Sequence, residues 1–201
     1  MTRYAIQLTL GIKDVISRKI TDDYSVHRVV YDLFPRIRTT GEGDHSGFLY
    51  SDLGGSAKGR RILILSDRTP EKLDLRDSSL EIKEIPATFL GARSYRYKVD
   101  VNPAVRGKTD GKIRPVKGRE EIALWFANRS SRWGFTADSV EVASVRVLSF
   151  LKGGHPVTIE RATLTGVLTV TDRALFTRSF TSGIGRAKSF GCGLLQIVPI
   201  H

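Results

Sequence analysis

The chain has 201 residues, 40% of them hydrophobic and 26% charged, a composition typical of a folded globular protein and not of a disordered one. It contains no apolar run of the roughly 18 residues that a membrane helix needs, and its N-terminus alternates in character instead of forming a signal peptide, so we expect a cytoplasmic protein with no membrane segment. The 32 Lys and Arg residues outnumber the 21 Asp and Glu residues and give a net charge of +11, which favours a polyanionic partner such as a nucleic acid.

The first half of the chain is predicted to open with a strand and a helix. Residues 4–10 alternate apolar and polar side chains, the pattern of a half-buried strand. Asp22 and Asp23 offer N-cap side chains before apolar residues at helical spacing, and Pro35 ends this pattern, so we expect a helix over about 23–33. Further predicted elements are strands over 47–53 and 61–66 with a turn at 54–56, a short helix opening near 69–71, and a strand within 79–90.

The second half repeats the same order of elements. Expected strands cover residues 95–101, 140–150, 157–170 and 194–198, and expected helices cover about 119–132 and 172–181. Each half therefore follows the order β-α-β-β-α-β, which defines the ferredoxin-like unit with an antiparallel sheet and both helices on one face. We predict an α+β fold of two tandem ferredoxin-like (RRM-like) domains, residues 1–90 and 95–201, joined at 91–94.

His27 lies at the border of the apolar stripe on the predicted helix. At about 100° per residue, Tyr24, His27 and Tyr31 cluster beside the stripe that Val26, Val29, Val30 and Leu33 define. A histidine between tyrosines suits proton transfer, because the ordinary pKa of histidine is close to neutrality and a phenol can orient an imidazole or a phosphate. From spacing alone, a histidine that merely packs at the edge of the core remains the alternative.

A glycine-rich segment follows the last predicted helix and leads into the last predicted strand. It carries Gly183, Gly185, Gly191 and Gly193, with Arg186 and Lys188 among them. Glycine lets the backbone approach a phosphate closely, and the two cations add charge, so the segment is predicted to be a phosphate-binding loop. Its spacing matches neither the P-loop nor the dinucleotide fingerprint. A helix-capping glycine would explain Gly183 but not the interleaved basic residues.

A second basic segment lies between the predicted strand 95–101 and helix 119–132. Its cations are separated by glycines and are Arg106, Lys108, Lys112, Arg114 and Lys117. We expect a flexible loop that can lie along phosphates, with a solvated connection as the alternative. The aromatic residues that follow are spaced as core positions and are interpreted as packing.

Most kinds of catalytic machinery have no counterpart in the sequence. Paired carboxylates in a suitable context and a nucleophile elbow are both missing. Cys192 stands alone and the four histidines are isolated, so we expect no metal and no small-molecule cofactor. RNA can still be cleaved by such a chain, because its own 2′-OH attacks the adjacent phosphate and the protein needs only an acid or base, positive charge and geometry.

Blocks that span nearly the whole chain carry a resemblance to a known family. They are Asp23–Arg28 through Leu33–Pro35, Tyr97 through Asn102–Pro103, Gly107–Lys108, Trp125–Phe126 through Gly134–Phe135, and Gly183–Leu195. In this order they resemble the CasE family of CRISPR repeat-processing endoribonucleases of type I-E systems, within the repeat-associated RNA-binding superfamily. The resemblance implies two ferredoxin-like domains, the fold that the element order also predicts.

The resemblance also implies an activity and its residues. The implied enzyme recognises CRISPR repeat stem-loops, cleaves precursor crRNA 3′ of the stem without metal by 2′-OH attack, and leaves a 2′,3′-cyclic phosphate and a 5′-hydroxyl. His27 would be its general base or acid and Tyr24 would orient His27 or the phosphate. The cut crRNA would stay bound, with other subunits of a type I surveillance complex as partners. Candidate RNA-binding residues are Arg28, Arg36, Arg38, Lys108, Lys112, Arg114, Gly183, Gly185, Arg186, Lys188 and Gly191.

The chain departs from the family pattern in places that leave alternatives open. Tyr31 stands where tryptophan is frequent, and no residue matches a catalytic lysine of the family. Arg36, Arg38 and Lys188 are candidates, by charge and position, for stabilising the transition state. The main alternative is a noncatalytic RNA-binding subunit of the same superfamily. A second is a ferredoxin-like module outside CRISPR biology that stacks single-stranded bases on its sheet, although no predicted strand presents the aromatic pair that this requires.

Overall fold

A computed structural model of the chain describes residues 2–34, 46–71 and 75–200. The N-terminal half contains a four-stranded antiparallel sheet in the order β2-β3-β1-β4. Its elements are β1 Tyr4–Leu10, α1 Ile12–Ser17, α2 Asp23–Asp32, β2 Phe48–Ser56, β3 Gly59–Ser66 and β4 Ser79–Glu84. A 3-10 turn over Ala87–Gly91 leads from this sheet to the second one.

The C-terminal half contains a second antiparallel sheet, in the order β11-β5-β10-β8, with β9 also paired to β10. Its elements are β5 Ser94–Val101, α3 Arg119–Ser130, β8 Phe135–Ala137, β9 Glu141–Lys152, β10 His155–Val170, α4 Arg173–Ser182 and β11 Gln196–Ile200. A separate hairpin, β6 Ala104–Arg106 and β7 Ile113–Pro115, projects beside α3.

Both halves have the ferredoxin-like strand order, in which the first strand lies between the third and the fourth. This order is β4-β1-β3-β2 in the first half and β11-β5-β10-β9 in the second. The predicted α+β, two-unit ferredoxin-like fold is therefore confirmed, while the domain limits 1–90 and 95–201 remain a prediction. Leu49 and Leu65 of the first sheet pack into the core of the second half, so the halves share apolar contacts.

The alternation seen in the sequence explains how α2 is held on its sheet. Ile6, Leu8 and Leu10 of β1 are fully buried and form one core with Val26 and Val30 of α2. The helix begins at a capping box, in which the Asp22 carboxylate accepts from Ser25 N at 2.7 Å and Ser25 Oγ accepts from Asp22 N at 3.0 Å. Capping and burial together fix the rotation of α2 and hence the position of His27.

Some local features differ from the predictions. Residues 54–56 continue β2, and the chain turns at 57–58 instead. Residues 69–71 and 75–78 form no helix, and 72–74 lie outside the described residues. Helix α1 was not among the predicted elements. Its N-cap makes no side-chain hydrogen bond of the kind that marks the start of a helix in a sequence. It is held by a distant contact, in which buried Asp14 accepts from Arg76 N, Asp77 N and Ser78 Oγ.

In the part of the chain that the structure describes, no helix is both long and apolar enough to cross a membrane.

Candidate active site

His27 projects from the second turn of α2 between two tyrosines, as its position at the border of the apolar stripe predicts. Its ring centroid lies 5.7 Å from that of Tyr24 and 4.0 Å from that of Tyr31. All three side chains are half-buried, whereas Val26 and Val30 beside them are fully buried. The predicted cluster of Tyr24, His27 and Tyr31 is therefore present on one side of the helix.

One backbone carbonyl fixes the tautomer of His27. Nδ1 of His27 lies 2.6 Å from the carbonyl oxygen of Ser189, and the Tyr50 hydroxyl donates to the same oxygen at 2.9 Å. Because a carbonyl oxygen can only accept, Nδ1 of His27 must carry its hydrogen. Nε2 of the same ring then accepts a proton when the imidazole is neutral and donates one when it is protonated, as a general base or acid requires.

Tyr50 can hold this carbonyl over a wide pH range. The side chain is 2% exposed, and burial raises the pKa of its phenol well above the ordinary value for tyrosine. The phenol therefore stays protonated and keeps donating to Ser189. Sequence inspection missed Tyr50 and Ser189, because they meet His27 only through the tertiary fold.

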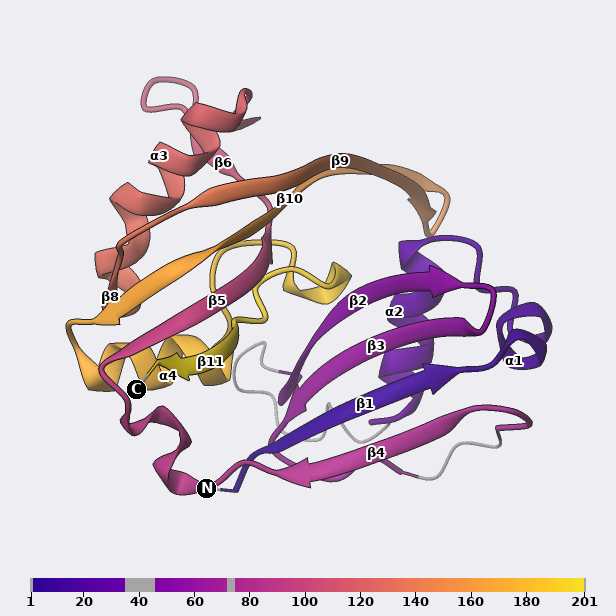
Figure 1. The fold of residues 1–201 in the computed structure, drawn as a ribbon. Helices are drawn as coiled ribbons and strands as arrows, with labels where there is room; N and C mark the ends of the chain where they lie inside the picture. The colour runs from indigo at the N-terminus through magenta and orange to yellow at the C-terminus, as the bar shows by residue number, and fades with distance from the viewer. Residues whose placement is uncertain (1, 35–45, 72–74, 201) are drawn as a thin grey trace.

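Aromatic rings from the second half complete the surroundings of the histidine. Phe150 of β9 stacks on Tyr24 with ring centroids 6.0 Å apart, and Phe190 lies 4.7 Å from Phe150 and 5.5 Å from His27. The long β9–β10 hairpin thus arches from the second sheet toward α2 (Figure 1). Helix α2, the β9–β10 hairpin and the glycine-rich segment meet around His27.

The glycine-rich segment has a backbone path that needs glycine at defined positions. Gly183 ends α4 with φ +74°, and Gly191 and Gly193 have φ +79° and +86°. Gly193 N donates to Asp100 O at 2.7 Å, and Ile184 N donates to Gly193 O at 3.0 Å. A methyl group built on Gly193 would lie 2.4 Å from Ile184 O. Close backbone packing therefore sets the shape of this loop.

The two cations of the loop differ in their surroundings. Arg186 is exposed beside Gly185, as a phosphate contact requires. The Lys188 ammonium donates to Ser182 O at 2.7 Å, and partial burial lowers its pKa. Lys188 thus ties the loop to the end of α4, and its predicted contact with RNA stays a prediction.

Four more of the predicted RNA-binding residues are described by the structure, and they lie on two other parts of the surface. Arg28 is exposed on α2, with its guanidinium 5.8 Å from the centroid of the Tyr24 ring. Lys108, Lys112 and Arg114 are exposed on the β6–β7 hairpin, which replaces the expected irregular loop. Arg114 pairs there with Asp110 at 2.6 Å. Arg36 and Arg38 lie outside the described residues.

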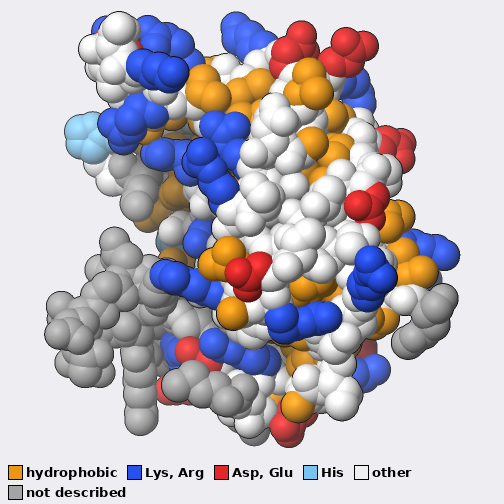
Figure 2. Space-filling model, turned by 90° about the vertical axis from the view of Figure 1, so that its left-hand side faces the viewer, with side chains coloured by type: hydrophobic (Ala, Val, Ile, Leu, Met, Phe, Trp, Pro, Cys, Tyr) orange, Lys and Arg blue, Asp and Glu red, His pale blue; other side chains and the backbone are white. Residues whose placement is uncertain are grey.

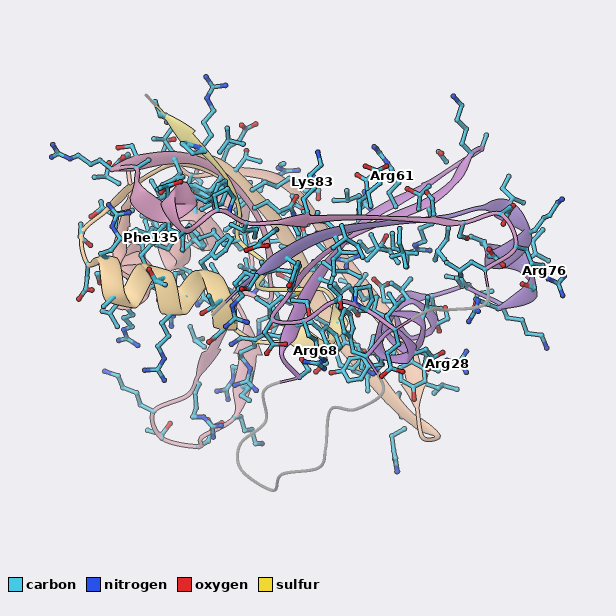
Figure 3. The ribbon with its side chains drawn as sticks, turned by 90° about the horizontal axis from the view of Figure 1, so that it is seen from below. Arg28, Arg61, Arg68, Arg76, Lys83 and Phe135 are labelled. Carbon is cyan, nitrogen blue, oxygen red and sulfur yellow. The ribbon has the colours of Figure 1, made fainter. Side chains whose placement is uncertain are left out.

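Positive charge gathers around this hairpin. Figure 2 shows Lys and Arg side chains close together at the upper left of the molecule, and Figure 1 places β6 at the top. Figure 3 shows the hairpin projecting on the same side of the molecule as Arg28, away from Arg61 and Lys83. A polyanion lying across this side could reach both the hairpin and α2.

The other potentially reactive groups that the structure describes include a buried cysteine and scattered acidic and histidine side chains. Burial raises the pKa of the Cys192 thiol to about 12, which disfavours the thiolate form that a cysteine nucleophile needs. Over residues 2–34, 46–71 and 75–200, His, Cys, Asp and Glu side chains form no group of three or more that could hold a metal ion.

The protein is of the tandem ferredoxin-like class. A glycine-rich loop of its second unit packs on the helix of the first unit that carries His27. The chain belongs to the CRISPR associated protein family, whose model matches residues 3–199. The resemblance to CasE seen in the sequence blocks is confirmed.

Individual relatives cover nearly the whole chain. The CRISPR system Cascade subunit CasE of Escherichia coli (strain K12) is 25% identical over 201 residues, which cover 94% of this chain and 98% of that protein. A structure of the CRISPR endoribonuclease Cse3 bound to a 19-nucleotide RNA superposes with a TM-score of 0.85 at 20% identity, covering 99% of this chain and 100% of that one. Thermus thermophilus Cse3, bound to an RNA representing a pre-cleavage complex, gives a TM-score of 0.84 at 20% identity and the same coverage.

The role of Gly193 in the loop can be tested by stability. We expect Gly193→Ala to lower the free energy of unfolding by about 2–4 kcal/mol, because a positive φ is strained for alanine and the new methyl group meets Ile184 O. Gly185→Ala is the matched control, since its φ of +71° is similar but no atom lies within 4 Å of the added methyl group. Thermal unfolding of both variants measures the difference, and equal losses would contradict the close-packing argument.

Proposed function

We propose that this protein is a metal-independent endoribonuclease that recognises CRISPR repeat stem-loops and cleaves precursor crRNA 3′ of the stem. The observation that carries the proposal is the placement of His27, whose Nδ1 is committed to Ser189 O so that Nε2 can exchange a proton with a substrate. The RNA-bound state of the Cse3 structures and the name of the E. coli Cascade subunit support RNA as the substrate. The net charge of +11 suits the same partner.

The chemistry needs no group beyond the chain and the RNA. The 2′-oxygen upstream of the cut attacks the adjacent phosphorus and loses its proton, while the bond to the 5′-oxygen breaks and that oxygen gains a proton. The products are a 2′,3′-cyclic phosphate and a 5′-hydroxyl. His27 serves as the base at the 2′-OH or the acid at the 5′-oxygen, and Tyr24 orients His27 or the phosphate.

Binding and retention follow from charge. Arg28 near Tyr24, Arg186 in the glycine-rich loop and the hairpin cations bind the RNA backbone, with Arg36, Arg38 and Lys188 as further candidates. The cut crRNA stays bound, and the protein joins other subunits of a type I surveillance complex. The E. coli relative is named as such a subunit.

The test is cleavage of a labelled CRISPR-repeat hairpin in excess EDTA. We expect cutting to continue in EDTA and to stop when the residue at the cut site is 2′-deoxy, because the deoxy residue has no attacking oxygen. Loss of cutting in EDTA would contradict a metal-independent mechanism. Tight binding without any cutting would make the protein a noncatalytic RNA-binding subunit instead.

Recognition of the stem is tested separately by competition. We expect the hairpin to outcompete a single-stranded RNA of the same length and composition, because a rigid duplex presents its phosphates in a fixed array. Affinity is measured by fluorescence anisotropy at several salt concentrations. Equal affinity for both RNAs would contradict stem recognition and favour a module that reads single strands.

A further inference from the structure

Arg161 is a buried cation that joins the two halves of the protein next to the candidate active site. It lies on β10 of the second sheet, and its Nη2 pairs with Oδ1 of Asp23 at 3.0 Å. Asp23 is the first residue of α2, the helix that carries His27. The side chains of Arg161 and Asp23 are only 10% and 18% exposed, so this is a largely buried ion pair between the halves.

A gain in folding stability does not explain the buried ion pair between Arg161 and Asp23. Nη1 of Arg161 is buried and has no hydrogen-bond partner in the described part of the chain. Buried ion pairs are often no more stable than apolar side chains of similar size, and an unpaired buried donor adds a further cost. Arg161 therefore contributes more to the local geometry than to stability.

That geometry concerns the loop that holds His27. A methyl group built on Gly191 would lie 3.6 Å from Nη1 of Arg161 and 3.1 Å from Cε2 of Tyr50. Arg161 and the Tyr50 ring therefore lie close to one face of Gly191, two residues after Ser189. The Ser189 carbonyl in turn accepts from both Tyr50 and His27.

We propose that Arg161 is a positioning residue for His27. Its guanidinium holds the start of α2 through Asp23 and packs beneath the loop at Gly191, so that helix and loop meet with Nδ1 of His27 against Ser189 O. Without this link, α2 and the loop can shift relative to one another, and His27 loses its fixed tautomer. This proposal rests on the proposed function for its effect on catalysis, but its effect on the His27 ring is independent of any activity.

The first measurement is the tautomer of His27 in RNA-free protein, read by ¹⁵N NMR of the imidazole nitrogens at a pH where histidine is neutral. The wild type is expected to show hydrogen on Nδ1. Arg161→Met keeps a long side chain without charge and is expected to give a mixture of tautomers. Asp23→Asn is nearly isosteric, removes the same ion pair from the other side, and is expected to shift the tautomer in the same direction.

The matched control is Arg60→Met. Arg60 also pairs with an aspartate, Asp52, on a neighbouring strand of the same sheet, and it feels the charges of Asp22 and Asp23 without an ion pair to either among the described residues. The His27 tautomer is expected to be unchanged in this variant. Single-turnover cleavage of the repeat hairpin is then expected to be roughly 10- to 100-fold slower in Arg161→Met, because a small displacement of a catalytic group is costly, and unchanged in Arg60→Met.

The outcomes separate the two proposals. A His27 tautomer that stays on Nδ1 in both Arg161→Met and Asp23→Asn overturns the positioning role, whatever the cleavage rate. If the His27 tautomer shifts in the variants but the wild type never cuts RNA, the positioning role is supported and the proposed function is contradicted. If Arg161→Met fails to fold, the tautomer of His27 in Asp23→Asn decides on the positioning role, because this substitution only replaces a carboxylate oxygen by an amide nitrogen at the start of α2.

Discussion

Replacing His27 by alanine is expected to slow cleavage of a repeat hairpin by roughly 10²- to 10⁴-fold, the usual cost of losing a positioned acid or base. RNA affinity is expected to stay close to that of the wild type, because the exposed Arg and Lys side chains proposed to bind the RNA backbone are unchanged. Single-turnover cleavage with excess enzyme measures the rate, and anisotropy measures the affinity. A loss of rate without a loss of binding would assign His27 to the chemical step.

His155→Ala provides the control for this experiment. His155 is an exposed histidine at the start of β10 and is not part of the cluster around Ser189. The same change in side chain there is expected to leave the rate unaltered. If His27→Ala also cuts at the wild-type rate, then its contact with Ser189 O is packing, and another group must transfer the proton.

The place of His27 on its helix could be predicted from the sequence because the pattern lies within one helix, whereas its catalytic role was implied by the family resemblance and stays a prediction. The spacing of Val26, Val29 and Val30 predicts which side of α2 is buried, and His27 follows at the border of that side. The strand orders of both halves were likewise predictable, because alternation and element order limit an antiparallel sheet to few arrangements.

The residues that complete the site could not be identified in this way. Ser189 is 162 residues from His27 in the sequence, and Tyr50 is 139 residues from Ser189. No periodicity connects such positions, because their contacts arise from the packing of one half against the other. The glycines around Ser189 indicated a tight loop, but not that its carbonyl accepts from a histidine. The internal contact of Lys188 was also outside what charge alone can predict.

Neutralising the β6–β7 hairpin is expected to cause the largest loss of RNA affinity. In the triple variant Lys108→Gln, Lys112→Gln and Arg114→Gln, three exposed cations are removed from one surface. If each contacts one phosphate, the slope of log K against log salt falls by about 3, because each contact releases nearly one counterion. This corresponds to roughly 10²-fold weaker binding near physiological salt, with little difference near 1 M salt.

A second triple variant separates this effect from net charge. Arg61→Gln, Arg76→Gln and Lys83→Gln remove the same formal charge from exposed residues, and Figure 3 shows Arg61 and Lys83 on the opposite side from the hairpin. Since screening at physiological salt limits long-range attraction to about 8 Å, the control is expected to bind nearly as well as the wild type. If both variants lose affinity equally, the RNA is held by overall charge and the hairpin is not a binding surface. If only the hairpin variant loses affinity and salt dependence, the RNA stem lies along β6–β7. The single-turnover cleavage rate of this variant at saturating protein is then expected to equal that of the wild type, because the hairpin binds RNA without taking part in the chemical step.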